Sequence, residues 1–198
     1  MSRARTVLLV TAALVAGLLT APSAASAATP ETTPVTGFES GSAALTTVTG
    51  VASTADSDDS TEGDSSLEVS YDVTGGLAEL GFDPLQAPVI PAPASALTVD
   101  LRGDGSYNTV YLRVRDRSGE TFVHRVDAMR STQWQTLIVD LTAEPVTRDG
   151  GDGNGVMDAP LTVAGVLVVR NGEQPPTGTF ALDDLRADTT GWTLPVAA

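Results

Sequence analysis

Short runs in which apolar and polar residues alternate recur along most of the chain, and this alternation constrains its fold more than any other feature. Apolar residues occupy every second position in 97–101, and the same spacing returns in 110–114 and 137–141. Side chains of a strand point to opposite faces in turn, so this spacing predicts strands with one face in a core. No segment sustains a helical period, and turn-forming residues separate the runs. The pattern therefore predicts an all-β fold, a two-sheet antiparallel sandwich of about nine strands.

Segments rich in turn-forming residues or in proline separate the predicted strands, and this composition indicates loops. Residues 54–66 are almost wholly Ser, Asp, Thr and Gly, and 81–95 contain four Pro, which exclude a helix or a central strand. We interpret the second segment as a crossover between sheets. Four aromatic residues are expected in the core, and Trp134 is expected to be a packing anchor: Phe38, Phe82, Phe122 and Phe180. The predicted strands span 35–40, 45–53, 66–73, 96–102, 109–116, 120–127, 133–141, 162–170 and 178–187.

The first 27 residues have the order of a secretory signal peptide. Arg3 and Arg5 precede an apolar run over 7–19, and small residues follow. We expect cleavage after Ala27, a secreted product, a flexible lead-in over 28–34, the sandwich over 35–188 and a tail over 189–198. The apolar run is too short to span a bilayer and no second one follows, so we expect no membrane insertion.

Composition limits the partners of the exported chain. It has no Cys and no Lys, and once Arg3 and Arg5 leave with the signal, nine Arg face 25 Asp and Glu, a net charge of −16. This charge repels phosphate backbones and anionic lipids, which excludes nucleic acid as a favoured partner. Neutral polymers and divalent cations fit it better. Because no disulfide can form, the burial of apolar surface must stabilise the fold. We expect the chain to be a monomer.

An ordered set of motifs resembles a known family. The motifs are Gly-Phe-Glu-Ser-Gly at 37–41, Ser-Leu-Glu-Val-Ser-Tyr at 66–71, the segments 97–105 and 111–116, Gln-Trp-Gln-Thr at 133–136 and Phe-Ala-Leu-Asp-Asp-Leu at 180–185. Together they resemble the galactose-binding-like carbohydrate-binding modules of secreted bacterial glycoside hydrolases, the middle part especially those that accompany phosphodiester glycosidases. The resemblance covers most of the mature chain. It implies a jelly-roll sandwich that binds polysaccharide and leaves catalysis to a different domain.

The resemblance also implies a structural calcium ion. In such modules an acid of the opening motif and one of the closing pair meet at Ca²⁺, and Glu39 with Asp183 or Asp184 match those positions. Ca²⁺ takes six to eight oxygen ligands, which carboxylates supply. The alternative is that these are ordinary acids at strand ends. A second acidic segment, 149–158, is similar to calcium-binding loops but lacks the closing Glu of an EF-hand, so we interpret it as an unmetallated turn.

A candidate ligand surface follows from the polar side of the alternating strands. Sugars are bound by aromatic rings and by side chains that hydrogen-bond hydroxyl groups, and a sheet presents such groups in rows. The alternative is a solvated face with weak cross-strand charge pairs. The candidate ligand-binding residues are Asp100, Arg102, Tyr107, Tyr111, Arg113, Arg115 and His124.

Known catalytic motifs are missing from the sequence. His124 is the single His, there is no Cys, and no Gly-x-Ser-x-Gly motif occurs, which argues against a serine triad and against catalytic zinc. A carboxylate pair that hydrolyses glycosidic bonds stays open. Three function classes therefore remain: a free-standing carbohydrate-binding module, which we favour, a structural module of the cell envelope, and a small polysaccharide-active enzyme.

Overall fold

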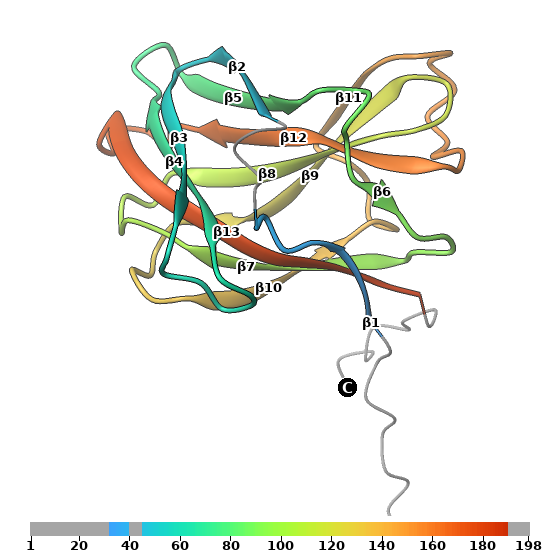
Figure 1. Ribbon diagram of the computed structural model, residues 1–198. Coiled ribbons are helices and arrows are strands. Elements are labelled where there is room, and N and C mark those ends of the chain that lie inside the picture. The colour runs from blue at the N-terminus through green and yellow to red at the C-terminus, as the bar shows by residue number, and fades with distance from the viewer. Residues whose placement is uncertain (1–31, 40–44, 190–198) are drawn as a thin grey trace, which may run out of the picture.

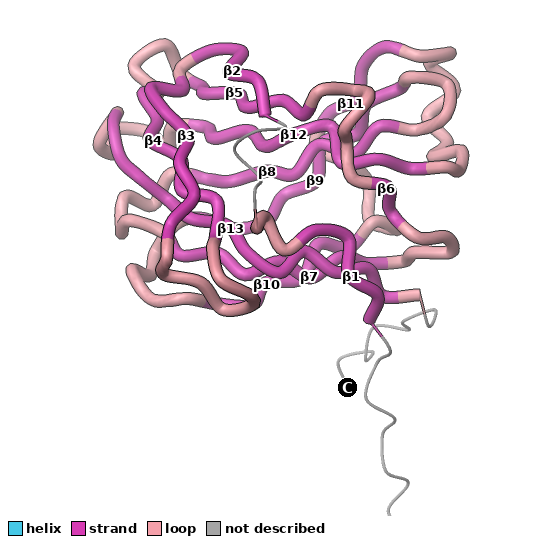
Figure 2. Tube along the Cα trace, viewed as in Figure 1, coloured by secondary structure: helices cyan, strands magenta, loops and turns pink. Residues whose placement is uncertain are grey.

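The computed structural model describes residues 32–39 and 45–189, which form thirteen strands in two antiparallel sheets (Figures 1 and 2). The described residues contain no helix, and so none that could cross a membrane. The predicted all-β sandwich is confirmed, with more strands than expected. The predicted signal peptide, and all but the first residue of the predicted tail, lie outside the described residues.

Each sheet combines strands that are far apart in the sequence. Sheet A runs in the order β10 (Gln135–Asp140), β7 (Ala96–Arg102), β13 (Thr177–Asp188), β4 (Ser66–Asp72), β3 (Val51–Ser57), and β1 (Thr32–Thr36) pairs with β13. Sheet B runs in the order β11 (Thr147–Gly150), β9 (Glu120–Ala128), β8 (Thr109–Arg115), β12 (Leu161–Val169), β5 (Leu77–Phe82), β2 (Leu45–Thr49), and β6 (Val89–Ile90) pairs with β12. Figure 1 shows the two sheets as stacked layers.

The core lies between the sheets and is built by the residues that the alternation assigned to it. The inward positions of β7 and β8 are all buried, and so are the four Phe. Burial of apolar surface at about 25 cal/mol per Å² is the main stabilising contribution in a chain without disulfides. The buried residues of this predicted set are Leu97, Val99, Leu101, Val110, Leu112, Val114, Val139, Leu141, Phe38, Phe82, Phe122 and Phe180.

Gly50 divides one predicted strand into two. The segment 45–53 was expected to be continuous, but Gly50 adopts a φ of 62°, and β2 joins sheet B while β3 joins sheet A. A Cβ at this position would lie 2.5 Å from the carbonyl oxygen of Asp72, so a residue with a side chain is sterically excluded. Strands β5, β6 and β11 were not predicted. The segment after β6 crosses from sheet B to sheet A, as the proline-rich composition indicated.

Candidate functional site

The structure divides the predicted ligand residues between two outward faces. Tyr111 and Arg113 lie on β8 in sheet B, whereas Asp100 and Arg102 lie on β7 in sheet A. All four side chains alternate with core residues, so each points away from the interior. The two pairs therefore lie on opposite sides of the sandwich. The expectation of a single ligand surface that contains all of these residues is therefore wrong.

His124 is a second correction, because its side chain points inward. It pairs with Leu112 across β9 and β8, shares the inward face with it and is 3% exposed. Its ring hydrogen-bonds the backbone of Asp140, and Nε2 has no hydrogen-bond partner among the described residues. Burial lowers the pKa of the imidazole, and Asp140 only partly offsets this effect. His124 cannot contact a ligand on the outer face.

Tyr107 lies at neither face but in the loop between β7 and β8. It has a φ of 64° and is 50% exposed, and its backbone is held by hydrogen bonds with Met129 and Asn171. Its place at the end of the sandwich separates it from the outward row of β8.

On sheet B, the strand register places one row of residues across six strands, which we call the glycine row. Gly81 and Gly165 are direct partners in this row, so no side chain rises from the centre of the sheet there. A Cβ on Gly165 would collide with the carbonyl oxygen of Leu80, which explains the glycine at that position. The glycine row consists of Thr46, Gly81, Gly165, Arg113, Val123 and Thr147.

A parallel row beside it carries the aromatic ring, and we call it the tyrosine row. An ion pair joins the two rows, between Arg113 of the first and Glu79 of the second, and these side chains are only 17% and 23% exposed. Such low exposure on the outward face of a sheet shows that the pair lies close against the sheet. The tyrosine row consists of Thr49, Glu79, Leu167, Tyr111 and Arg125. The two rows together are the sheet B surface.

Both arginines of the sheet B surface form ion pairs. Arg113 pairs with Glu79, and Arg125 pairs with Asp127 at 3.4 Å. Arg115, next along β8, has no ion pair among the described residues. The surface therefore offers an aromatic ring, guanidinium donors and a carboxylate acceptor side by side, the combination that binds polyhydroxylated ligands.

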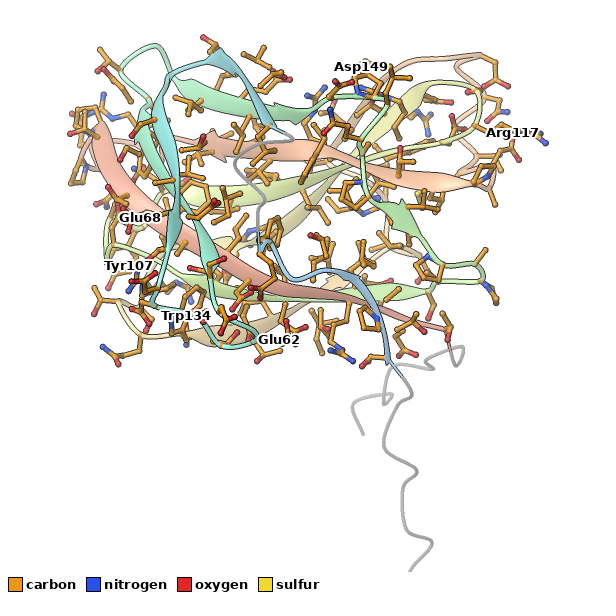
Figure 3. The ribbon with its side chains drawn as sticks, in the orientation of Figure 1. Glu62, Glu68, Tyr107, Arg117, Trp134 and Asp149 are labelled. Atoms are coloured by element: carbon orange, nitrogen blue, oxygen red, sulfur yellow. The ribbon has the colours of Figure 1, made fainter. Side chains whose placement is uncertain are left out.

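A different cluster occupies the outward face of sheet A, and we call it the Trp134 cluster. Arg102 forms ion pairs with Asp59 and with Glu68, the latter at 3.5 Å, and its Cζ lies 5.4 Å from the centroid of the Trp134 ring. The indole N–H donates to Asp59 Oδ1 at 3.0 Å. Trp134 is half-buried and outside the core, so the expected packing anchor is wrong. In Figure 3 Trp134, Glu68 and Glu62 lie toward one side of the molecule, and Arg117 and Asp149 toward the other.

Asp183 and Glu39, two of the predicted calcium ligands, hold the same loop. Asp183 is fully buried, and its Oδ2 accepts hydrogen bonds from the Thr61 amide at 2.6 Å, the Thr61 hydroxyl at 3.0 Å and the Glu62 amide at 3.0 Å. Glu39 Oε2 accepts one from the Asp64 amide at 2.9 Å. The loop over 58–65 is thus fastened to both ends of the predicted calcium motif.

Glu62 joins these acids, and Asp184 does not. A Cβ at Gly37 would lie 2.8 Å from Glu62 Oε2 and 3.6 Å from Glu39 Oε1, so both carboxylates flank this glycine. Asp184 pairs instead with Arg186 at 3.1 Å. No three His, Cys, Asp or Glu residues converge as a preformed metal site within residues 32–39 and 45–189. Glu62 was missed because it lies in a loop of many acids that no pattern distinguishes.

In the acidic segment 149–158, hydrogen bonds within the protein engage the carboxylates. Asp152 accepts from the Asn154 amide at 3.2 Å, and the buried Glu120 accepts from the Gly155 amide at 3.1 Å. Burial alone would raise the pKa of Asp116, but hydrogen bonds from Ser118 and from backbone amides lower it.

Comparison with known proteins supports the fold. No protein-family model matches the chain, and no curated protein matches it in sequence. Among solved structures, a family 11 carbohydrate-binding module from Clostridium thermocellum in complex with a β-1,3-1,4-mixed-linked tetrasaccharide superposes with a TM-score of 0.59 and 16% identity, covering 80% of this chain and 95% of that one. The family 11 module of a cellulosomal cellulase from the same organism gives 0.54 and 15%, covering 84% and 99%.

An exo-β-agarase gives a TM-score of 0.55 and 16% identity, covering 81% of this chain but only 26% of that one. The chain therefore has the jelly-roll fold of carbohydrate-binding modules, as the sequence resemblance implied. At such low identities the likeness extends to the fold and not to individual ligand-binding residues.

Proposed function

We propose that this protein is a non-catalytic polysaccharide-binding module and that the sheet B surface is its binding face. The observation that carries the proposal is the ion pair of Arg113 and Glu79, held close against the sheet beside Tyr111 and the paired Gly81 and Gly165. The two glycines carry no side chain, and Val48 and Thr46 border the position above Gly81. The neighbouring residues supply the groups that would hold a sugar ring.

The chemistry of these groups fits a neutral sugar. A pyranose presents an apolar C–H face, which an aromatic ring such as Tyr111 contacts, and a rim of hydroxyls that both donate and accept hydrogen bonds. Arg113 donates, Glu79 accepts, and their pairing cancels the charge. Glycoside hydrolysis needs two carboxylic groups in distinct roles, and the two rows hold one carboxylate, which is tied in an ion pair. This surface supports binding without turnover.

Replacement of Tyr111 tests the binding face. We expect Tyr111→Ala to weaken binding to soluble mixed-linked β-glucan at least about fivefold, because one aromatic contact contributes about 1 kcal/mol. Tyr107→Ala is the matched control, since this exposed tyrosine lies in a loop outside both rows. Affinity electrophoresis and calorimetry on mixed-linked β-glucan, xylan and galactan measure the effect. Unchanged binding by Tyr111→Ala would refute the proposed face.

We also propose that the chain acts outside the cell as a monomer and that it binds one structural calcium ion. Glu39 and Asp183 are the carboxylates that would hold the ion, because both fasten the loop over 58–65, and the Glu62 carboxylate lies beside the same glycine as that of Glu39. Within the described part of the chain these carboxylates do not converge, so they would have to draw together when the ion binds. Bringing carboxylates together without a cation is unfavourable, and a bound Ca²⁺ would neutralise them.

Calcium dependence is measured by thermal unfolding. We expect added Ca²⁺ to raise the melting temperature and excess chelator to lower it, because a ligand that binds only the folded state stabilises it. Glu62→Gln should remove most of this shift. Asp58→Asn, a change to an exposed acid in the same loop, should leave it intact. A melting temperature that is the same in calcium and in chelator would exclude the site.

A further inference from the structure

The Trp134 cluster has the features of a second binding site, on the side of the sandwich opposite to the sheet B surface. Tryptophan combines a large apolar ring with an N–H donor, and this combination is enriched where proteins bind other molecules. Trp134 is half-buried on the outward face of sheet A and lies outside the core. Its ring is therefore at the surface, where a ligand could reach it.

The ring is fixed in orientation by its neighbours. Its N–H is bonded to Asp59, and Arg102 lies over the ring and is itself held by both Asp59 and Glu68. Each contact restricts a torsion of the indole before any ligand arrives. Preorganised side chains lose less conformational entropy on binding, which is why rigid aromatic residues serve as anchors in recognition sites.

The structure extends this cluster along one line of sheet A. Arg102, Ala181, Glu68 and Ala55 are successive partners across β7, β13, β4 and β3. The polar groups thus alternate with small residues beside the tryptophan. An aromatic ring beside a guanidinium that pairs with a carboxylate repeats the combination of groups found on the sheet B surface.

We propose that the Trp134 cluster is a second carbohydrate-binding site and that the module is bivalent. Because sheets A and B turn their outward faces in opposite directions, one protein monomer would hold two polysaccharide chains and join them. The inference shares with the proposed function only the class of ligand; its residues are independent of the sheet B surface.

Charge selects a neutral glycan for this site. Arg102 is neutralised by two carboxylates, and Asp100 precedes it by one outward position on the same strand, so acidic groups outnumber basic ones. A uronic acid would be repelled by this excess. Hydroxyl groups of a neutral sugar would instead donate to the carboxylates, while its C–H groups would contact the part of the indole that Arg102 does not cover.

Binding stoichiometry tests the inference. In calorimetry with the mixed-linked β-1,3-1,4-glucan tetrasaccharide, we expect two sites per chain in the unmodified protein and one in Trp134→Ala or in Tyr111→Ala. Trp134→Phe should keep the second site at reduced affinity, because the aromatic face remains. Arg130→Ala, an exposed residue of the loop before Trp134, is the control and should retain both sites. Polygalacturonate should bind at neither site.

Cross-linking of a polymer gives a second readout. We expect soluble mixed-linked β-glucan to form large scattering particles with the unmodified protein and none with either single variant, and unchanged melting curves show that the variants fold. One site that Tyr111→Ala removes and Trp134→Ala leaves intact would overturn the second site and keep the proposed function. One site that Trp134→Ala removes and Tyr111→Ala leaves intact would overturn the sheet B surface as a binding face and keep the Trp134 cluster as a binding site. A protein that binds no neutral glycan of the panel would overturn both.

Discussion

The imidazole of His124 lies between the sheets with Nε2 lacking a hydrogen bond among the described residues. A protonated imidazole in this position would be a buried cation, which the surroundings disfavour, and burial accordingly lowers the pKa of His124 below the ordinary 6.5. A hydrogen bond to the backbone of Asp140 and the negative charge of its carboxylate favour the protonated form but do not reverse the shift. We therefore expect the protonation of His124 to make the fold sensitive to mild acid.

The sign of this effect follows from proton linkage. Below about pH 6.5 the unfolded chain binds a proton at His124 that the folded chain does not, so the free energy of unfolding falls by up to about 1.4 kcal/mol per pH unit until the folded-state pKa is reached. We expect His124→Leu to remove this slope between pH 7 and 5 in denaturant titrations. A slope that persists in the variant would assign the acid sensitivity to other groups.

Carboxylates contribute in a separate and lower window. Hydrogen bonds from Thr142 lower the pKa of Asp140, and those from Ser118 and from backbone amides lower that of Asp116 against the effect of burial. Groups with a lowered pKa stabilise the fold above the ordinary value of 3.8, and that stability is lost as the pH falls further. The two windows let His124 be measured apart from the acids.

At the scale of elements, the loop over 58–65 depends on one buried carboxylate. Asp183 accepts three hydrogen bonds from Thr61 and Glu62 across more than a hundred residues of sequence. Without that carboxylate the loop would lose its link to β13, and the link from Asp59 to the Trp134 cluster would weaken with it. The loop thus connects the candidate calcium ligands to the outward face of sheet A.

We expect Asp183→Ala to lower the free energy of unfolding by about 3 kcal/mol, because it removes a buried carboxylate that accepts three hydrogen bonds, and hydrogen bonds to charged groups contribute about 1.5–3 kcal/mol. Amide hydrogen exchange at Thr61 and Glu62 should accelerate in the native state. Asp183→Asn, which keeps one carbonyl oxygen, should have an intermediate effect, and Asp58→Ala should have none. Equal exchange rates in Asp183→Ala and the unmodified protein would show that the loop is held by other contacts.

Sequence could predict those strands that pack one face against the core, because such a strand has apolar residues at every second position. Strands β7 and β8 were predicted to within one residue because their apolar residues alternate without interruption. Strand β11 is four exposed polar or glycine residues at the edge of sheet B, so burial leaves no mark on its sequence. Gly50 shows the same limit, since a turn between sheets and a flexible strand position look alike in sequence.

At the scale of the whole molecule, alternation determines which face a side chain joins but not which sheet its strand joins. Strands β7 and β8 are consecutive in sequence and equally amphipathic, yet they belong to different sheets. The prediction that Asp100 and Tyr111 point outward is therefore correct, but the prediction that they share one surface is wrong. The pairing of sheets depends on contacts between distant segments, such as β13 with β4, which no local pattern contains.

The antiparallel pair of β1 and β13 places Thr32 directly beside Asp188. A tension applied through the segments that flank the domain would act on both strands at the same end of this pair. The hydrogen bonds between the two strands would then break one after another, as in the unzipping of a strand pair, and not all at once. We therefore expect mechanical unfolding to begin with the separation of β1 from β13, at a lower force than the rest of sheet A withstands.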